Sequence, residues 1–294
     1  MNKKLLLLIP AVVILLAAGA VTWLYTGSLS DSKVKVFARV PLPAAIVGKK
    51  LLFAQDLIDR VELSKKLANA QGADDATAPE DLRSQVYDRL VDAKKLEAIA
   101  GEKKVSVTSD QINQEYKDIV DQYGEGNEAK FADDLRQSYG LNSSQFKDKV
   151  LRLDVLQSNL AIWFNGQESL NQKAYQLAGD LKAKLQNGES FESVAAAYTQ
   201  DEAMKNFAGD SGFLPFTDLL PEYQAALKDA KPGDLKLVPG RSGLLLIKVL
   251  ERDNNGDNGA DRIHLQQIFV ETSSFADWYQ KESSDIKVTK LLKL

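Results

Sequence analysis

The sequence predicts an α+β protein in which a membrane helix precedes a helical domain and then a small α/β sheet domain. The uncharged run 5–25, about 21 residues, is long enough to cross a hydrocarbon core of about 30 Å. Residues 53–164 repeat helical spacing between capping signals. Beyond residue 200, short apolar runs such as Leu244 to Val249 indicate strands separated by glycine-rich turns. The 294 residues suffice for about two domains besides the membrane segment.

Charge and composition exclude several classes of function. The formal net charge is −4, whereas nucleic-acid binding favours a basic surface, so we expect no nucleic-acid partner. The chain has no cysteine, which excludes disulfides, a thiol nucleophile and a cysteine-linked lipid anchor. His264 is the single histidine, which excludes a two-histidine active site and most histidine metal sites. We therefore expect neither a metal nor a cofactor.

The amino end has the features of a membrane anchor. Two lysines precede the run 5–25, and positive charge on this side places the amino end in the cytoplasm and the rest outside. Trp23 and Tyr25 would lie in an interfacial aromatic belt. The segment Ala18-Gly19-Ala20 resembles a signal-peptide cleavage site, which is the alternative. Because the apolar run continues beyond it, we favour an uncleaved anchor over residues 1–27, with lipid contact through 5–25.

Residues 28–166 are predicted to form a helical domain. A polar tether over 26–35 and an extended segment over 36–47 precede its first helix. Three capping boxes mark helix starts: Thr77 with Glu80, Thr108 with Gln111, and Asn142 with Gln145. The predicted helices cover 53–67, 79–100, 108–123, 131–139 and 142–164. This part of the sequence offers no nucleophile–base pair, metal-ligand cluster or phosphate loop, so it reads as a binding or packing module.

The second domain, residues 167–272, is organised around the stretch Gly209 to Tyr223. Two glycines beside an aspartate permit positive φ and close backbone approach, and Pro221 suits the first turn of a helix. Helices are predicted at 169–186 and 190–198 before this stretch. Strands are predicted at 235–238, 244–249 and 263–270, and the second should be central because it is nearly all apolar. Asp253 to Asp261 reads as a loop.

Four segments of the helical part occur in a recognisable order. They are Ile-Val-Gly-Lys-Lys-Leu-Leu-Phe at 46–53, Leu-Val-Asp-Ala-Lys-Lys-Leu at 90–96, Val-Ser-Val-Thr-Ser-Asp-Gln-Ile at 105–112 and Tyr-Gly-Leu-Asn-Ser-Ser-Gln-Phe at 139–146. A long helix follows them. This order resembles the amino-terminal chaperone domain of the SurA and PrsA class of extracytoplasmic foldases. In related foldases the carboxyl end folds back onto this domain, and we expect the same of residues 273–294.

Four further blocks lie in the second domain. Phe191 to Asp201 is similar to Phe-x-x-Leu-Ala-x-x-Tyr-Ser-x-Asp, and Gly209 to Tyr223 is similar to Gly-Asp-Leu-Gly-Trp-Phe … Met-Val-Pro-Glu-Phe. Lys231 to Leu235 is similar to Lys-Pro-Gly-Glu-Ile, and Gly243 to Val249 to Gly-Tyr-His-Ile-Ile-Lys-Val. In this order they resemble the parvulin-type (PpiC) peptidyl-prolyl cis–trans isomerases, or rotamases. The resemblance implies rotation about X–Pro bonds without a cofactor or a covalent intermediate.

The chain departs from the parvulin pattern at the first strand. That strand, which begins His-Ile-Leu in the family, should precede the helix at 169–186, where nothing reads as a strand. Gln267 to Thr272 resembles it instead, which implies a circular permutation. In that case Gln267 to Val270 should pair beside Leu244 to Val249. The alternative is an added hairpin.

The resemblance also implies the residues of a proline site. Its apolar contacts would be Leu219, Tyr223 and Phe213. Its catalytic positions would be Asp201, Ser242, Leu245 and Gln267, of which Leu245 and Gln267 replace the two family histidines. His264 lies three residues before the Gln267 position, so it should face the other side of its strand as a solvent or edge residue.

The sequence therefore favours a single-pass, membrane-anchored foldase whose bulk is extracytoplasmic. Its partners would be unfolded or exported polypeptides with X–Pro bonds. The replaced histidines leave isomerase activity open, and the rival is a non-catalytic chaperone or scaffold with a degenerate parvulin domain. A third interpretation, a membrane-tethered helical adaptor, predicts no small sheet after Ser190.

Overall fold

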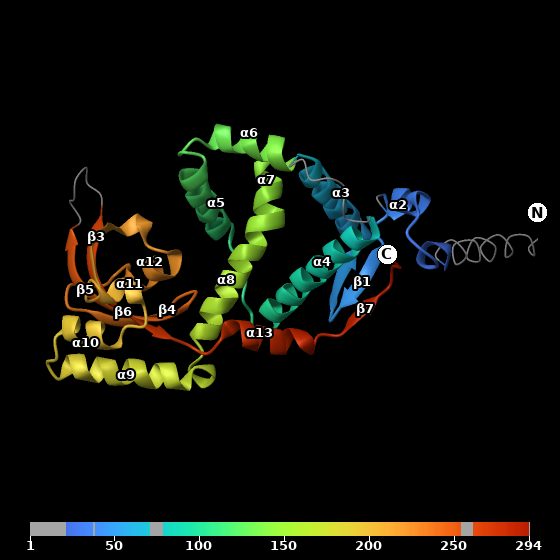
Figure 1. Ribbon diagram of the computed structural model, residues 1–294. Coiled ribbons are helices and arrows are strands. Elements are labelled where there is room, and N and C mark those ends of the chain that lie inside the picture. The colour runs from blue at the N-terminus through green and yellow to red at the C-terminus, as the bar shows by residue number, and fades with distance from the viewer. Residues whose placement is uncertain (1–21, 38, 71–78, 254–260, 294) are drawn as a thin grey trace, which may run out of the picture. The chain divides into compact units, whose positions relative to one another are not determined.

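The computed structural model of the protein describes residues 22–37, 39–70, 79–253 and 261–293 (Figure 1). The chain gathers into two units, each with its own sheet and core. The first unit takes in the described residues up to Lys104, then Tyr116–Leu153 and those from Lys281 onwards. The second takes in Val105–Glu115 and Asp154–Gln280. The predicted α+β class, with a helical part before a small sheet domain, is confirmed.

The sheet of the first unit has the order β2–β1–β7, with both pairings antiparallel. β1 (Pro43–Val47) and β2 (Lys50–Phe53) form a hairpin through the predicted turn, where Gly48 has a φ of +57°. β7 (Val288–Lys290) pairs with the other edge of β1. A strand from the far end of the sequence therefore completes this sheet (Figure 1).

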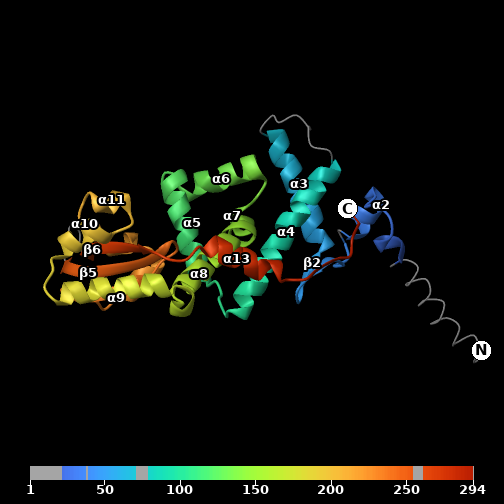
Figure 2. The same cartoon turned by 60° about the horizontal axis from the view of Figure 1, so that its bottom comes forward.

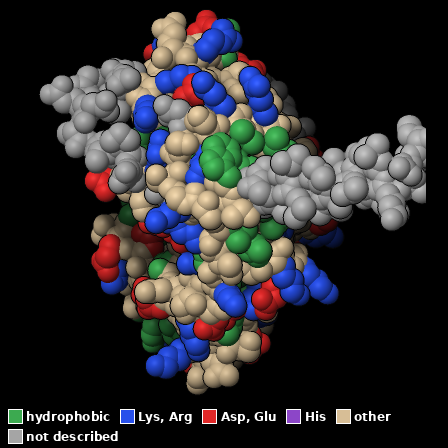
Figure 3. Space-filling view, turned by 90° about the vertical axis from the view of Figure 1, so that its right-hand side faces the viewer, with side chains coloured by type: hydrophobic (Ala, Val, Ile, Leu, Met, Phe, Trp, Pro, Cys, Tyr) green, Lys and Arg blue, Asp and Glu red, His purple; other side chains and the backbone are tan. Residues whose placement is uncertain are grey.

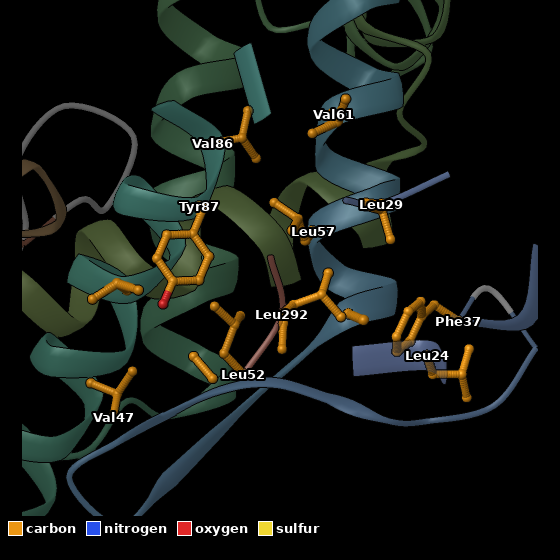
Figure 4. Close-up of a cluster of buried hydrophobic side chains, with 14 residues drawn as sticks. Leu24, Leu29, Phe37, Val47, Leu52, Leu57, Val61, Val86, Tyr87 and Leu292 are labelled. Atoms are coloured by element: carbon orange, nitrogen blue, oxygen red, sulfur yellow. The ribbon is translucent and has the colours of Figure 1, made fainter. Parts of the chain in front are cut away.

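The core of the first unit forms where three helices pack with this sheet. The helices are α2 (Asp31–Phe37), α3 (Ala54–Ala70) and α4 (Pro79–Glu102). Figure 4 shows the buried side chains, with Leu292 pointing among those of Leu52 and Leu57. Burying one such leucine stabilises a fold by about 1.5–3 kcal/mol.

The remaining helices of the helical part begin and end at the signals in the sequence. They are α5 (Ser109–Tyr123), α6 (Glu128–Tyr139), α7 (Ser143–Phe146), a π-helical turn (Lys147–Leu151) and α8 (Arg152–Asn165). In the capping box before α5 the Thr108 amide donates to Gln111 Oε1 at 3.0 Å, and the Gln111 amide donates back to Thr108 Oγ1. The box of Asn142 and Gln145 is likewise present. The box predicted at Thr77 and Glu80 lies outside the residues whose side chains are described.

Two expectations near the amino end are corrected. The segment 26–35 is not a tether throughout, and 36–47 is not extended throughout, because α2 covers Asp31–Phe37 and β1 starts only at Pro43. The Phe37 side chain is fully buried in the core, and a helix lets it turn inward from a partly polar segment.

The last residues of the predicted anchor make contacts within the first unit. Leu24 is buried in the core of the first unit. The Tyr25 hydroxyl donates to the Pro43 carbonyl at 2.9 Å, and its ring meets that of Phe37 edge-on. Leu24 and Tyr25 therefore contact other residues of the first unit. Residues 5–21 of the predicted anchor lie outside the described residues. Over the part of the chain that is described, no helix combines the length and apolar character needed to cross a membrane.

The second unit contains a four-stranded antiparallel sheet in the order β3–β6–β5–β4. The strands are β3 (Asp210–Pro215), β4 (Leu235–Pro239), β5 (Gly243–Asp253) and β6 (Arg262–Glu271). The register places Leu244 opposite Val270 and Ile247 opposite Gln267. The predicted pairing of 267–270 beside 244–249 is therefore confirmed, and β5 is central as expected.

Each face of this sheet carries its own apolar core. α9 (Gln172–Gln186) and α10 (Phe191–Tyr198) cover one face, where Leu244, Leu246 and Ile268 lie (Figures 1 and 2). α12 (Pro221–Leu227) covers the other face, with Ile247 and Leu265. Side chains alternate between the two faces along a strand. Because β5 is buried on both faces, its successive residues enter different cores.

Aromatic contacts join α8 to α13 (Phe275–Ser284), and a hydrogen bond joins α8 to the turn between β4 and β5. The Phe164 ring lies 5.8 Å from that of Phe275 and 5.1 Å from that of Trp278. Asn165 Nδ2 donates to the Gly240 carbonyl at 2.8 Å. Because of these contacts α8 belongs to the second unit from Asp154 onwards, which differs from the division at residue 166 suggested by the sequence.

The space-filling view of one face shows Lys, Arg, Asp and Glu side chains spread between small groups of hydrophobic ones (Figure 3). Mixed charges of this kind are typical of a surface that faces water.

Two glycines of the stretch 209–223 allow a sharp test of why glycine is needed. Gly209 has a φ of +80°, and a Cβ there would lie 2.5 Å from the Gln267 carbonyl oxygen, whereas Gly212 has a φ of +63° and open space around it. We expect Gly212→Ala to lower the free energy of unfolding by about 1–2 kcal/mol through backbone strain alone. Gly209→Ala should cost at least about 3 kcal/mol, because steric overlap adds to the strain. Urea denaturation measures both, and equal losses would contradict the close approach.

Candidate functional site

The candidate site lies on the α12 face of the four-stranded sheet, and the stretch 209–223 builds it. After Gly209 the chain forms β3, which pairs with β6 through a bulge between Asp210 and Phe213. A single 3₁₀ turn over Phe216–Asp218 then leads to α12, with Pro221 in its first turn. Proline suits this position because its missing N–H has no partner to lose there. The stretch therefore runs from the edge of the sheet onto its α12 face.

Three of the sequence-predicted residues come together here. Leu219, Tyr223 and Leu245 are half-buried and pack against one apolar cluster of the α12 face. Leu219 and Tyr223 come from the segment over the sheet, and Leu245 comes from central strand β5. Together they form an apolar surface that is partly accessible, which is the environment a proline ring requires.

The Tyr223 hydroxyl reaches the turn between β4 and β5. A Cβ at Gly240 would collide with this hydroxyl, so the tyrosine fits only because residue 240 is glycine. Burial, and next the charge of Glu222, raise the pKa of Tyr223 to about 12, although Arg241 opposes the shift. The phenol is therefore neutral at physiological pH.

Gln267, which the sequence resemblance predicts to occupy one of the family's histidine positions, lies on the same face. It pairs directly with Ile247 of β5, whose side chain belongs to the α12-side cluster, and directly paired residues share a face. Gln267 Nε2 donates to the Met204 sulfur at 3.5 Å. An amide here can donate a hydrogen bond but cannot titrate as a histidine does.

Asp201 is the N-cap of a short helix. Its Oδ1 accepts hydrogen bonds from the amides of Ala203 and Met204, at 2.9 and 3.2 Å, and so caps α11 (Glu202–Lys205). Met204 thus contacts both Asp201 and Gln267, through its amide and its sulfur. The sequence analysis did not identify Met204, because nothing in the linear pattern distinguishes it from a core methionine. Ser242 is exposed in the turn before β5.

Phe213 lies elsewhere. It pairs with His264 across β3 and β6, and the two rings are 5.0 Å apart. His264 precedes Gln267 by an odd number of residues, so this pair lies on the α10 side of the sheet. The structure therefore does not bring Phe213 to Leu219 and Tyr223. An open hollow of about 750 Å³ adjoins His264, with Met204, Phe207 and Asp210 among its lining residues.

The sequence predicted a solvent or edge residue at His264, whereas this residue lies in β6, between β3 and β5. Its side chain is only 22% exposed, and its Nε2 lies 2.7 Å from Asp210 Oδ1. The Gly212 amide and then His264 hold the pKa of Asp210 below its usual value. The expectation of the opposite strand face was right, but Asp210, where the bulge in β3 begins, supplies a partner that the spacing did not predict.

A second feature that the sequence did not reveal surrounds Arg241. Its guanidinium lies 3.4 Å from a Glu115 oxygen and 3.7 Å from a Glu222 oxygen. Glu222 is nearly buried at the start of α12, and Glu115 comes from α5. The arginine therefore fixes the turn that carries Gly240 and Ser242 beside Tyr223.

The site can bind and desolvate an apolar ring without covalent chemistry. Its contacts are leucine and tyrosine side chains, with a neutral amide and a neutral phenol at hand. Over the described residues, no group of three or more histidine, aspartate or glutamate side chains is placed to hold a metal ion.

Two protein families match the chain. The model of the SurA-like N-terminal domain matches residues 1–161. The model of the PPIC-type PPIASE domain matches residues 143–253. The second match ends where β5 ends, before β6.

Similar proteins carry related names. "Chaperone SurA" of Nitrosospira multiformis is 34% identical over 80 residues, 27% of this chain and 18% of that protein. "Foldase protein PrsA" of Geobacillus kaustophilus is 25% identical over 175 residues, 56% of this chain and 60% of that protein. The chain thus spans less than two thirds of the length of both relatives. A solved structure of peptidylprolyl isomerase (PrsA) from Bacillus anthracis has 18% identity and a TM-score of 0.21, covering 67% of this chain and 86% of that one.

The SurA-like match covers more than half of the 294 residues and the order of the two matches follows the order of the two sequence resemblances. The chain belongs to the family of proteins with a SurA-like N-terminal domain, and a PPIC-type PPIASE domain follows.

Proposed function

We propose that the protein is an extracytoplasmic foldase that holds unfolded polypeptides and isomerises X–Pro bonds in them. The observation that carries this proposal is the convergence of Leu219, Tyr223 and Leu245 on one face of the sheet. The names of the similar foldases and chaperones support the same conclusion.

The chemistry follows from the barrier to rotation of the peptide bond. That barrier is about 18–20 kcal/mol and arises from amide resonance. The proline ring would rest on Leu219 and Tyr223, out of water. There a twisted amide would lose less solvation free energy than its planar forms do. Only contacts that are stronger in the twisted state accelerate the rotation. No proton needs to be transferred, so Gln267 and Leu245 in the histidine positions are compatible with this mechanism.

A second candidate function is client binding without turnover. Two observations favour it: Leu245 has no polar group to offer the twisted amide, and the Asp201 carboxylate is engaged in capping α11. On this hypothesis the sheet domain retains an apolar surface for proline-containing segments and works as a chaperone or scaffold.

We propose further that β6 takes the place of the family's first strand. Its antiparallel pairing with both β5 and β3, and its position between them, support this. The loop from Asp253 to Asp261 would then be the new link of a circular permutation. The proposed domains are an anchor at 1–27, a helical domain at 28–166, a parvulin-like domain at 167–272 and a closing segment at 273–294.

We also propose that the amino end anchors the protein in a membrane. Two lysines before an uncharged run support a single span with the bulk of the chain outside the cytoplasm. The intact protein should resist extraction from membranes by alkaline carbonate, and an external protease should digest it in spheroplasts. Recovery in the carbonate supernatant would contradict the anchor.

Replacing Leu219 tests the proline site. Leu219→Ala should lower kcat/KM for a short X–Pro peptide at least about tenfold, because roughly 1.4 kcal/mol of transition-state contact is lost. Leu220→Ala is the matched control: its neighbouring side chain is 40% exposed and outside the cluster, so the rate should be unchanged. A protease-coupled isomerase assay measures both. A wild-type rate equal to the uncatalysed one, with suppression of client aggregation retained, would establish binding without turnover.

Substitutions at Asp201 distinguish a catalytic role of its charge from a role as a helix cap. Asp201→Ala should lower the free energy of unfolding by about 1 kcal/mol, whereas Asp201→Asn, which keeps an accepting oxygen, should retain stability within a few tenths. If the carboxylate acts only as a cap, the Asn variant should also isomerise X–Pro peptides at the wild-type rate. A stable Asn variant with a tenfold slower rate would assign a direct role to the charge.

A further inference from the structure

The edge of β1 that faces away from β2, called the outer edge below, pairs with a short segment near the carboxyl end of the described residues. Val288, Thr289 and Lys290 of β7 pair with Val47, Ile46 and Ala45. All three β7 residues are exposed. The strand therefore contacts the rest of the unit mainly through its backbone.

Apolar side chains hold this segment at both ends. Leu292, only 2% exposed, enters the core of the first unit (Figure 4). Ile286 packs against the same core from the other end, and a Cβ at Gly48 would lie 3.4 Å from its methyl group. Between these anchors the Lys290 ammonium lies 4.9 Å above the centre of the Tyr87 ring.

The backbone contacts continue beyond the three paired residues. The Gly48 amide donates to the Lys287 carbonyl at 2.9 Å, and the amides of Leu291 and Leu292 both donate to the Ala44 carbonyl. These bonds require only an extended backbone from the occupant. Apart from the apolar anchors, any sequence without a proline at the bonded positions could supply them.

We propose that the outer edge of β1, together with the place among Leu52 and Leu57 that Leu292 fills, forms a binding site for an extended segment of an unfolded polypeptide. β7 and Leu292 occupy this site when no such polypeptide is bound. The partner is a strand-forming stretch with an apolar side chain at each end, because that is the chemistry of the segment seated there. Short terminal strands of this kind open far more readily than a whole domain unfolds. The inference rests on the proposed chaperone function for the identity of the partner, but the site itself does not.

A labelled peptide with the sequence of residues 286–293 tests the site on the full chain. By fluorescence anisotropy, the wild-type chain should bind it weakly, because its own segment competes for the same edge. The Leu292→Ser chain should bind it at least about tenfold more tightly, since the competing segment is then released more often. Val288→Ser, at an exposed position of the same strand, is the matched control and should leave the affinity unchanged.

The peptide itself provides the second arm. A peptide with serine in the Leu292 position should bind the Leu292→Ser chain at least about tenfold more weakly than the parent peptide does. Equal affinities of the two peptides, or equal affinities of the two chains, would overturn the proposal.

Hydrogen exchange on the wild-type chain keeps the test valid if the Leu292→Ser chain fails to fold. The amides of Gly48, Leu291 and Leu292 should exchange by local opening, at least about a hundredfold faster than the central amides of β5 and β6. Exchange at the same rate as β5 would mean that the edge is never vacated, and would contradict the proposal.

Competition by a client identifies the partner. A permanently unfolded, leucine-rich polypeptide should displace the labelled peptide, and its folded counterpart should not. Failure to displace it would contradict an unfolded partner at this edge. Peptide binding that persists when isomerase and aggregation assays are both negative would instead leave the site standing while refuting the proposed function.

Discussion

The pairing of β5 with β6 is the constraint on which the sheet unit depends. Both strands are central, and their register runs from Gly243 opposite Glu271 to Asp253 opposite Arg262. The alternation of side chains along them creates two cores, one under α9 and α10 and one under α12. A shift of register by one residue would send Ile247 and Leu265 to the wrong face. The ladder therefore fixes which residues can take part in the candidate site.

The same ladder explains the position of the stretch 209–223. The Gln267 amide donates to the Gly209 carbonyl at 2.8 Å, and the two backbones approach so closely that no side chain fits at Gly209. From this fixed point the chain crosses the edge of the sheet and delivers Leu219 and Tyr223 to the α12 face. Gly240 then leaves room for the Tyr223 hydroxyl. The apolar surface of the site thus depends on two glycines, one that a backbone approaches closely and one that a side chain approaches closely.

The replaced histidines acquire a physical interpretation from these contacts. Leu245 extends the apolar cluster. Gln267 donates a hydrogen bond to the Met204 sulfur, and the backbone amide of Met204 donates to the Asp201 carboxylate. The apolar surface suits a proline ring, and the neutral side chains of Leu245 and Gln267 are compatible with rotation about an amide, a reaction that involves no proton transfer.

In the first unit, strands from opposite ends of the sequence share one sheet, so its stability depends on a non-local contact. β1 receives β2 through a tight hairpin and β7 from the other end of the described chain. The hairpin is a local structure encoded by Gly48 and its neighbours. The β7 contact is held by few apolar side chains, with Leu292 the most buried of them. This difference makes the outer edge of β1 the part of the sheet that can open.

Local chemistry in the sequence determined the helix starts at Thr108 and Asn142, the turn at Gly48, the strands of the small sheet and the family resemblances. Capping, glycine turns and periodicity act over a few residues, so a single sequence reveals them. The tertiary structure alone decided that Phe213 faces His264 and not Leu219, because a bulge in β3 sets the side on which it emerges. It alone gave His264 its partner Asp210, buried Leu24 in the core of the first unit and packed Tyr25 against that core. Each of these depends on residues far apart in sequence that only folding brings within contact distance.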